Sequence, residues 1–177
     1  MVQLISTSPS EYRRSSVASP DRQDGSLSIS GLTPGSYRVV AHPWGPNCVA
    51  SVTSGSTDLM RNNFVVTPGT TPEPIDVALN NDCSSLEIST NQQGGQPASA
   101  QFLIVPAGQA AEPQVLFAGS GKAKVGNLAP GDYQIYAFAD LNGIEYANPD
   151  VLRKYSGQHV SLSPNDKAII TVDVNSP

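Results

Sequence analysis

The sequence predicts an all-β protein built from two antiparallel β-sandwiches in tandem, for three reasons. Residues 32–37, Leu-Thr-Pro-Gly-Ser-Tyr, return at 128–133 as Leu-Ala-Pro-Gly-Asp-Tyr, which indicates two copies of one fold. Short runs in which hydrophobic and polar residues alternate recur along the chain, as in half-buried strands. The 177 residues include 15 glycines and 15 prolines, spread throughout, which is typical of many turns rather than of helices.

The repeated stretch is predicted to form a β-hairpin, and its longer match runs from residues 25–41 to residues 121–137. Proline presets φ at the first central position of the turn, and the glycine after it accepts a positive φ. We expect the leucines and tyrosines of both copies to be buried, with each tyrosine hydroxyl bonded to a nearby backbone group. The repeated positions are Leu32, Pro34, Gly35 and Tyr37 in the first copy and Leu128, Pro130, Gly131 and Tyr133 in the second.

The first domain, residues 1–82, is expected to contain short strands separated by polar turns. Glycine, proline, asparagine and aspartate gather between the alternating runs and end each strand. Residues 80–82, Asn-Asn-Asp, are the expected domain boundary. The expected strands span residues 2–6, 15–18, 26–30, 36–42, 48–53, 64–66 and 75–79.

The second domain, residues 83–177, repeats this cycle and adds one helical segment. Asn148 and Pro149 form a favourable N-cap and first helical position, so we expect a short helix near 149–155. About seven strands with regular turns favour a Greek-key sandwich. Besides the repeated hairpin, the expected strands span residues 86–89, 100–105, 114–117, 159–162 and 168–174.

The first domain is predicted to lack its opening strand. Residues 3–5 align with residues 101–103, and nothing before residue 2 corresponds to the strand at 86–89. We expect 86–89 to lie at a sheet edge, and the edge beside residues 2–6 to be open for strand addition. Either the chain is part of a longer protein, or an identical subunit supplies the missing strand.

The charge distribution argues against nucleic acid as a partner. The net charge is −5, from 10 basic and 15 acidic residues, and the basic residues form no stripe or cluster. No hydrophobic run reaches the length of a membrane span, and the first residues lack a signal-peptide pattern. We therefore expect no membrane insertion, and either an intracellular protein or a piece of a longer secreted one.

Residues 25–42, with Asp24 before them, resemble the Asp-Gly-x-Phe-x-Phe-x-Gly-Leu-x-Pro-Gly-x-Tyr pattern of carboxypeptidase regulatory-like domains. These are seven-stranded sandwiches of the transthyretin-like and immunoglobulin-like type. Tandem versions occur in large bacterial envelope and secreted proteins, mostly as non-catalytic appendages. The resemblance implies an extracellular, cell-surface or periplasmic accessory module. The second copy departs from the pattern at 120–124, Ser-Gly-Lys-Ala-Lys. This departure affects the expected geometry of the local turn but not the expected fold.

Cys48 and Cys83 are the only two cysteines, and both stand at expected strand ends. In a protein that resembles secreted modules, such a pair is a candidate disulfide. Closing a loop of about 35 residues would stabilise the fold by on the order of 3–4 kcal/mol. The sequence leaves free thiols and a metal site open as alternatives.

The densest group of potential metal ligands is Asp140, Asn142, Glu145 and Asp150. Calcium binds six to eight oxygen ligands of this kind, often with a glycine in the loop. Their spacing matches no complete calcium-binding loop, and a polar turn followed by a helix cap explains the same residues. No other cofactor is expected.

Three aromatic residues are candidates for ligand binding. Trp44 falls on an expected exposed loop, and Tyr136 and Phe138 point away from the core face of their strand. Exposed aromatic rings stack on sugars, which favours a glycan ligand. Alternatively, Trp44 packs on a neighbouring domain and residues 140–155 cover the other two. The two histidines have no serine, cysteine or carboxylate partner at a recognisable spacing, so we expect no catalytic residue.

These observations favour a non-catalytic structural or assembly module of an extracellular or cell-surface protein. It would act as a spacer, an adhesion stalk or a filament subunit. Its partners would be neighbouring domains of the same longer chain, or identical subunits joined by strand addition at the incomplete first domain. The alternative is a carbohydrate-binding accessory module of a secreted enzyme.

Overall fold

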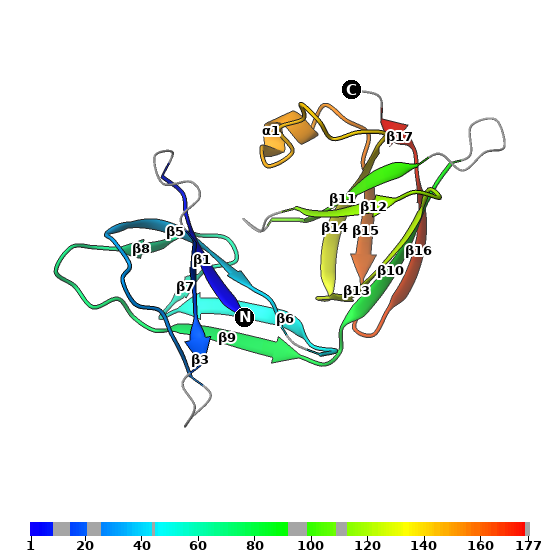
Figure 1. The fold of residues 1–177 in the computed structure, drawn as a ribbon. Coiled ribbons are helices and arrows are strands. Elements are labelled where there is room, and N and C mark those ends of the chain that lie inside the picture. Colours follow the sequence, from blue (N-terminus) through cyan, green and yellow to red (C-terminus); the bar gives the residue numbers. More distant parts are fainter. Residues whose placement is uncertain (9–14, 21–25, 44, 92–98, 109–112, 176–177) are drawn as a thin grey trace. The chain divides into compact units, whose positions relative to one another are not determined.

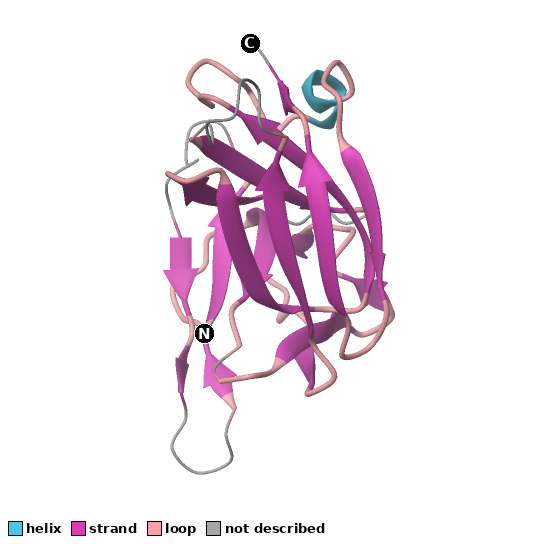
Figure 2. Cartoon of the chain, turned by 90° about the vertical axis from the view of Figure 1, so that its right-hand side faces the viewer, coloured by secondary structure: helices cyan, strands magenta, loops and turns pink. Residues whose placement is uncertain are grey.

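The computed structural model describes residues 1–8, 15–20, 26–43, 45–91, 99–108 and 113–175 (Figure 1). Their regular secondary structure is almost entirely strand, arranged in several largely antiparallel sheets, and the described residues contain a single short helix (Figure 2), so the predicted all-β class is confirmed. The chain forms two compact units. Unit 1 comprises Met1–Asn81, and unit 2 begins at Asp82, one residue from the boundary expected from the sequence. No helix in the described ranges is long and apolar enough to cross a membrane.

Unit 2 contains two sheets. A five-stranded sheet has the order β12-β11-β14-β15, with β17 also paired to β14, and a three-stranded sheet has the order β13-β10-β16. The strands are β10 (Ser84–Thr90), β11 (Ala100–Pro106), β12 (Gln114–Ala118), β13 (Lys122–Leu128), β14 (Gly131–Phe138), β15 (Gln158–Leu162), β16 (Lys167–Val172) and β17 (Val174–Asn175), and the helix is α1 (Pro149–Leu152).

The core of unit 2 is built from the alternating inward residues of these strands. Leu86 and Ile88 on β10 pack with Phe102 and Ile104 on β11 and with Ile135 on β14. Each of these side chains is at most 2 % exposed. The period of two along each strand therefore produces the packed interior of a sandwich.

Unit 1 is built from shorter strands. Its sheets have the orders β2-β1-β5-β8, β3-β4 and β7-β6-β9. The strands are β1 (Val2–Ser6), β2 (Ser15–Val17), β3 (Ser19–Pro20), β4 (Leu27–Ser28), β5 (Gly35–Ala41), β6 (Cys48–Ser54), β7 (Thr57–Asp58), β8 (Phe64–Val66) and β9 (Ile75–Asn80). Its core includes Leu4, Tyr37, Val52 and Phe64, and it has fewer buried members than the core of unit 2.

One sheet recurs in both units. The order β2-β1-β5-β8 matches β12-β11-β14-β15, and Tyr37 lies opposite Phe64 as Tyr133 lies opposite Val160. The offset is 96 positions for both members of the pair. The predicted repeat is therefore a repeat of strand pairing as well as of sequence.

The alignment of the first strands needs a correction of two residues. Leu4 lies opposite Val39, whereas the residue opposite Ile135 is Ile104, so β1 matches β11 with an offset of 100 rather than 98. A shift of two residues keeps every side chain on the same face of the sheet. The hydrophobic pattern alone could not distinguish the two registers.

The repeated motif is not a hairpin. The strands on either side of the Pro-Gly pair do not pair with each other, because β13 pairs with β10 while β14 pairs with β11, β15 and β17. The motif is a corner that carries the chain from one sheet to the other. We call residues 31–37 and 127–133 the corners. The same holds in unit 1, where β4 pairs with β3 and β5 pairs with β1 and β8.

The tyrosine hydroxyl closes each corner, as predicted. Tyr37 donates to the carbonyl of Thr33 over 2.6 Å, and Tyr133 donates to the carbonyl of Ala129 over 2.7 Å. Both rings are buried. Each hydroxyl thus satisfies a backbone acceptor that the change of sheet would otherwise leave without a strand partner.

The backbone of the corners matches the prediction in one copy only. Gly131 has a positive φ (148°), whereas the matching Gly35 does not. In both copies a left-handed residue also comes earlier, at Gly31 (φ 73°) and at the matching Asn127 (φ 58°). Asparagine is among the few residues that adopt this conformation readily. The chain therefore turns before the repeated leucine. Leu128 is buried as expected, but Leu32 is only half-buried.

Two expectations about sheet edges are wrong. The strand at 86–89 belongs to β10, which is central: it pairs antiparallel with β13 and parallel with β16. Strand β1 is not open either, because β2 and β5 flank it on both sides. The sequence pattern located the longer strands but not β3, β7 or β17, and it could not show that β16, the last long strand of unit 2, returns beside β10, its first.

We predict that replacing either corner tyrosine by phenylalanine lowers the free energy of unfolding by about 1 kcal/mol, because one hydrogen bond is lost. Urea unfolding of Tyr37→Phe and Tyr133→Phe measures this. Tyr155→Phe is the control, since its hydroxyl makes no hydrogen bond within the described residues and should change stability by less than about 0.5 kcal/mol. Equal effects of all three variants would contradict the role of the corner hydroxyls.

The same bond has a pH dependence in unit 2. Burial raises the pKa of Tyr133 to about 12, whereas the phenol of the unfolded chain ionises near 10. The tyrosine therefore loses its proton at a lower pH in the unfolded state than in the folded state. The contribution of Tyr133 to the free energy of unfolding falls as the pH rises from 10 towards 12. The stability difference between the natural chain and Tyr133→Phe should shrink from pH 8 to pH 11. A difference that stays constant would contradict this.

Candidate functional site

The aromatic candidates of unit 2 lie under a covering segment. Tyr136 and Phe138 are 7 % and 0 % exposed, so the expectation that they form an exposed binding surface is wrong. Residues 139–157, which include α1, pack over the outer face of β11 and β14. The covering residues are Leu141, Ile144 and Leu152, with Tyr146, Val151 and Tyr155 partly buried.

The cover is closely fitted to these rings. The ring of Tyr155 meets Phe138 edge-on, with 4.9 Å between centroids, and Phe138 lies 6.4 Å from Tyr136. A Cβ atom at Gly157 would lie only 2.6 Å from the ring of Tyr136, so glycine is required there for close approach. The alternative interpretation, coverage by residues 140–155, is the one that holds. Trp44 lies outside the described residues.

The candidate calcium ligands form a turn and a helix cap. Asp140 accepts hydrogen bonds from the backbone N–H (2.9 Å) and side-chain amide (2.8 Å) of Asn142, and these bonds hold the pKa of Asp140 below its usual value. Asn148 caps α1 by accepting from the backbone N–H of Asp150 over 3.0 Å. The carboxylate of Asp150 meets Arg153 at 2.9 Å.

These contacts leave little reason for a bound cation. The described residues contain no cluster of three or more histidine, cysteine, aspartate or glutamate side chains able to hold a metal ion, and Asp140, Glu145 and Asp150 belong to that described part. The local hydrogen bonds match the interpretation as a polar turn followed by a helix.

A serine, an aspartate and a histidine meet on β14 and β15, which the sequence did not indicate. Asp132 lies opposite Ser161 and accepts a short hydrogen bond from its hydroxyl, and the imidazole of His159 lies 3.5 Å from the same carboxylate oxygen. In a hydrolytic triad the histidine stands between serine and acid. Here the acid stands between the other two, so the histidine cannot take the serine proton. The three side chains form an exposed polar cluster.

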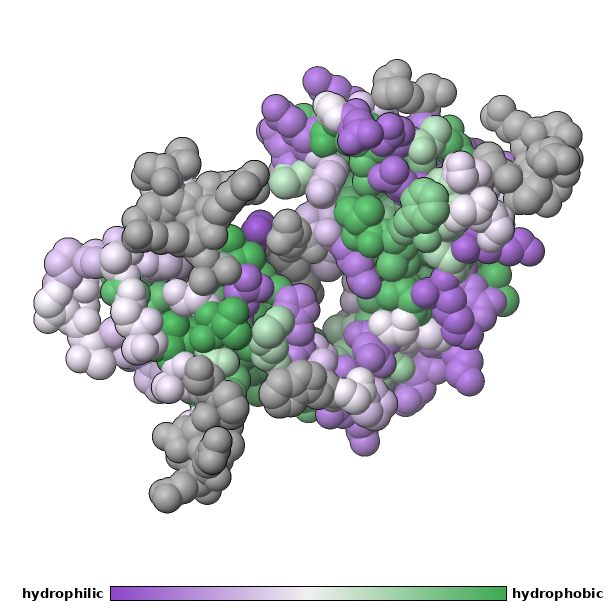
Figure 3. All heavy atoms as spheres, viewed as in Figure 1, coloured by the Kyte–Doolittle hydropathy of each residue, from purple (hydrophilic) through white to green (hydrophobic). Residues whose placement is uncertain are grey.

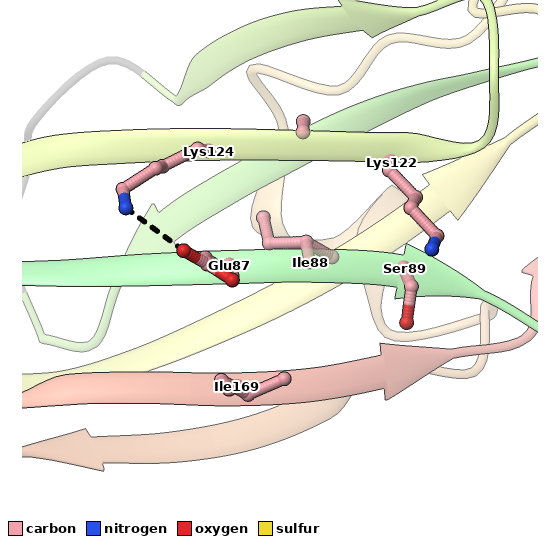
Figure 4. Close-up of a pocket in the computed structure, with 7 residues that line it drawn as sticks. Glu87, Ile88, Ser89, Lys122, Lys124 and Ile169 are labelled. Atoms are coloured by element: carbon pink, nitrogen blue, oxygen red, sulfur yellow. Dashed lines mark hydrogen bonds and ion pairs between the residues drawn. The ribbon is translucent and has the colours of Figure 1, made fainter.

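A shallow depression of about 360 Å³ lies on the outer face of the three-stranded sheet (Figure 4). Lys124 on β13 meets Glu87 on β10 at 2.8 Å, and this bond and charge lower the pKa of Glu87. Lys122 lies on the same side of β13, and Ile169 on β16 is 76 % exposed. The lining residues of the depression contain no nucleophile paired with a base.

Cys48 and Cys83 are joined by a disulfide, as one of the three interpretations predicted. Cys48 is 1 % exposed at the start of β6, opposite Asn80 at the end of β9. The bond spans the chain from 48 to 83 and so encloses β6, β7, β8 and β9 in one covalent loop. The alternatives of free thiols and of a metal ligand pair do not apply.

No family model matches the chain, and no curated protein matches it. Solved structures with some similarity include the minor pilin GBS52 of Streptococcus agalactiae (12 % identity, TM-score 0.36, 99 % of this chain and 82 % of that one). A streptococcal ancillary pilin has 15 % identity, a TM-score of 0.35, and 90 % and 50 % coverage. The Bacillus anthracis TIE protein has 11 % identity, a TM-score of 0.39, and 98 % and 34 % coverage.

The chain thus spans half or less of the length of the latter two proteins. All three TM-scores lie below 0.5, so these similarities support no conclusion about activity or partners.

We predict that Phe138→Ala destabilises unit 2 by about 3–5 kcal/mol, because it opens a cavity between the sheet and its cover. Phe117→Ala is a matched control on the neighbouring part of the sheet, since its ring is 74 % exposed and its loss should change stability by less than about 0.5 kcal/mol. Urea unfolding measures both. A small effect of Phe138→Ala would show that the cover is not packed as described.

We predict that the unfolded, unreduced chain contains no titratable thiol and that two appear after reduction. The double variant with Cys48→Ala and Cys83→Ala should lose on the order of 3–4 kcal/mol of unfolding free energy, because its unfolded state is no longer constrained. After reduction, the natural chain should have the same free energy of unfolding as this variant. Two thiols before reduction would contradict the disulfide.

Proposed function

We propose that the chain is a non-catalytic structural module of an extracellular or cell-surface protein. It would serve as a spacer, an adhesion stalk or a filament subunit, with neighbouring domains of a longer chain as its partners. The observation that carries this proposal is the recurrence of one sheet and one corner in both units. A repeated fold without a repeated reactive group is typical of domains that act as spacers and stabilise a longer chain.

The polar side chains support this proposal because they form hydrogen bonds with the protein's own backbone. The corner tyrosines bond to backbone carbonyls, Asn148 caps a helix, and Asp140 closes a turn. Each of these side chains bonds to a backbone group no more than four residues away in the sequence. Polar side chains committed in this way stabilise a scaffold and are not available to a substrate.

The disulfide supports an oxidising location. Structural disulfides persist in secreted, cell-surface and periplasmic proteins and are rare in the cytosol. A bond that encloses four strands of unit 1 also suits a module that must stay folded without assistance outside the cell. This agrees with the proposal that the chain is a tandem carboxypeptidase regulatory-like module, which rests on residues 25–42 and 121–137.

The carbohydrate-binding alternative is weaker for a specific reason. Two of its three aromatic candidates, Tyr136 and Phe138, are covered by residues 139–157 and cannot stack on a sugar ring. Only Trp44 remains as a candidate from the sequence.

We predict that residues 1–177 show no saturable binding on an array of neutral and acidic glycans. Trp44→Ala and Phe117→Ala are the informative variants, because the first removes the remaining candidate and the second removes an exposed ring elsewhere. Saturable binding that is lost in Trp44→Ala and kept in Phe117→Ala would replace the structural role with carbohydrate binding.

A further inference from the structure

The first and last long strands of unit 2 lie side by side and run in the same direction. Strand β10 pairs in parallel with β16 over six successive positions, from Ser85 opposite Lys167 to Thr90 opposite Val172 (Figure 1). Among the described strands of unit 2, only β14 and β17 form another parallel pair. The N-terminal end of β10 and the C-terminal end of β16 therefore lie at opposite ends of one ladder.

Hydrogen bonds continue this contact before the ladder begins. The backbone N–H of Asn165 donates to the carbonyl of Asp82 over 2.8 Å. The hydroxyl of Ser84 is buried and donates to the carbonyl of Ser163 over 2.6 Å. The chain is thus held against the turn before β16 at the point where it enters unit 2.

The other end of the ladder is held in a similar way. The backbone N–H of Asn91 donates to the carbonyl of Val172 over 3.3 Å, and its side-chain amide donates to the carboxylate of Asp173. Strand β17 follows directly, and the side-chain amide of Asn175 donates to the carbonyl of Ala137 on β14 over 3.1 Å. The chain is therefore also held where it leaves the two sheets.

The inward face of the ladder is shielded from water. Leu86 and Ile88 of β10 are at most 2 % exposed and pack in the core of unit 2. Figure 3 shows hydrophobic side chains gathered in the middle of unit 2, with hydrophilic ones around them. Breaking a backbone hydrogen bond is costly where water cannot replace the lost partner.

Tension along the chain acts on this ladder from its two opposite ends. Force from the N-terminal side reaches β10 at its first residue, and force from the C-terminal side reaches β16 at its last residue. The two strands must then slide along each other, so the evenly spaced bonds of the parallel ladder share the load. Antiparallel neighbours that are pulled apart from one shared end open their bonds one after another instead.

Unit 1 is loaded in this second way. Strand β1 is antiparallel to β5, and Met1 and His42 exchange backbone bonds of 2.6 and 2.7 Å at one end of that ladder. Tension enters at Met1 and leaves through the disulfide from Cys48 to Cys83, so it acts at this same end. Residues 49–82 bear no tension, because the disulfide bypasses them.

We propose that unit 2 bears tension along the chain through the β10–β16 ladder, and that unit 1 unfolds first but lengthens only through residues 1–48. The parallel ladder sets the force that unit 2 withstands, and the disulfide limits the extension of unit 1. This inference rests on the proposed function as a spacer, stalk or filament subunit, since only a tethered module is pulled from both sides.

The first test pulls single molecules of the 177-residue chain by handles at residues 1 and 177 under oxidising conditions. The chain from residue 83 to 177 is twice as long as that from residue 1 to 48, so the gain in length identifies each unit. The shorter gain should come first, at lower force, and the longer gain at higher force. A longer gain that comes first overturns the proposal.

Changing the direction of pull tests the ladder without changing its bonds. An azide-bearing residue in place of Pro164, in the exposed turn before β16, attaches the second handle at the end of the ladder where β10 begins. The force that unfolds unit 2 should fall by at least about half, because the bonds then open in succession. The same variant pulled at residues 1 and 177 is the matched control. Equal forces in both directions overturn the proposal.

Reduction tests the disulfide bypass. Without the disulfide, residues 49–82 join the path, and the gain of unit 1 should lengthen by about 120 Å at about 3.6 Å per residue. The double variant with Cys48→Ala and Cys83→Ala should behave like the reduced chain, and the force that unfolds unit 2 should not change. An unchanged gain of unit 1 overturns the bypass. Saturable glycan binding would contradict the proposed function instead, and the pulling results do not depend on it.

Discussion

The hydrogen bond from a tyrosine hydroxyl to the carbonyl four residues earlier is the interaction on which both units depend. It closes the corner at which the chain leaves one sheet and enters the other, at Tyr37 and again at Tyr133. Leaving a sheet deprives backbone groups of their strand partners, and an unsatisfied buried carbonyl costs more than a formed bond contributes. The ring also packs into the core, so one side chain both closes the corner and anchors it.

The two units differ in how they use the segment that follows the corner strand. In unit 2, residues 139–157 form α1 and cover the outer face of the five-stranded sheet, which buries Tyr136 and Phe138. In unit 1 the segment that follows the corner strand instead contains β6 and β7, and β6 pairs with β9 in the other layer. The disulfide of Cys48 then holds the start of β6.

The polar residues of unit 2 show why proximity is a poor guide to chemistry in this fold. Asp132, His159 and Ser161 gather because β14 and β15 pair in register, and alternate residues of a strand share a face. Their order around the carboxylate excludes proton transfer from serine to histidine. The same pairing rule places Glu87 beside Lys124 on the three-stranded sheet. Both groups follow from strand register and stabilise the surface of the sheets.

Local information in the sequence determined the all-β class, the positions of the longer strands, the cap at Asn148 and the burial of the two tyrosines, because alternation, turn residues and capping act within a few positions. Tertiary structure alone decided which strands pair. It made the corner a change of sheet, placed β10 at the centre of its sheet, and covered Phe138. Pairing depends on contacts between distant residues, and an outward-facing aromatic residue looks the same in the sequence whether water or another segment covers it.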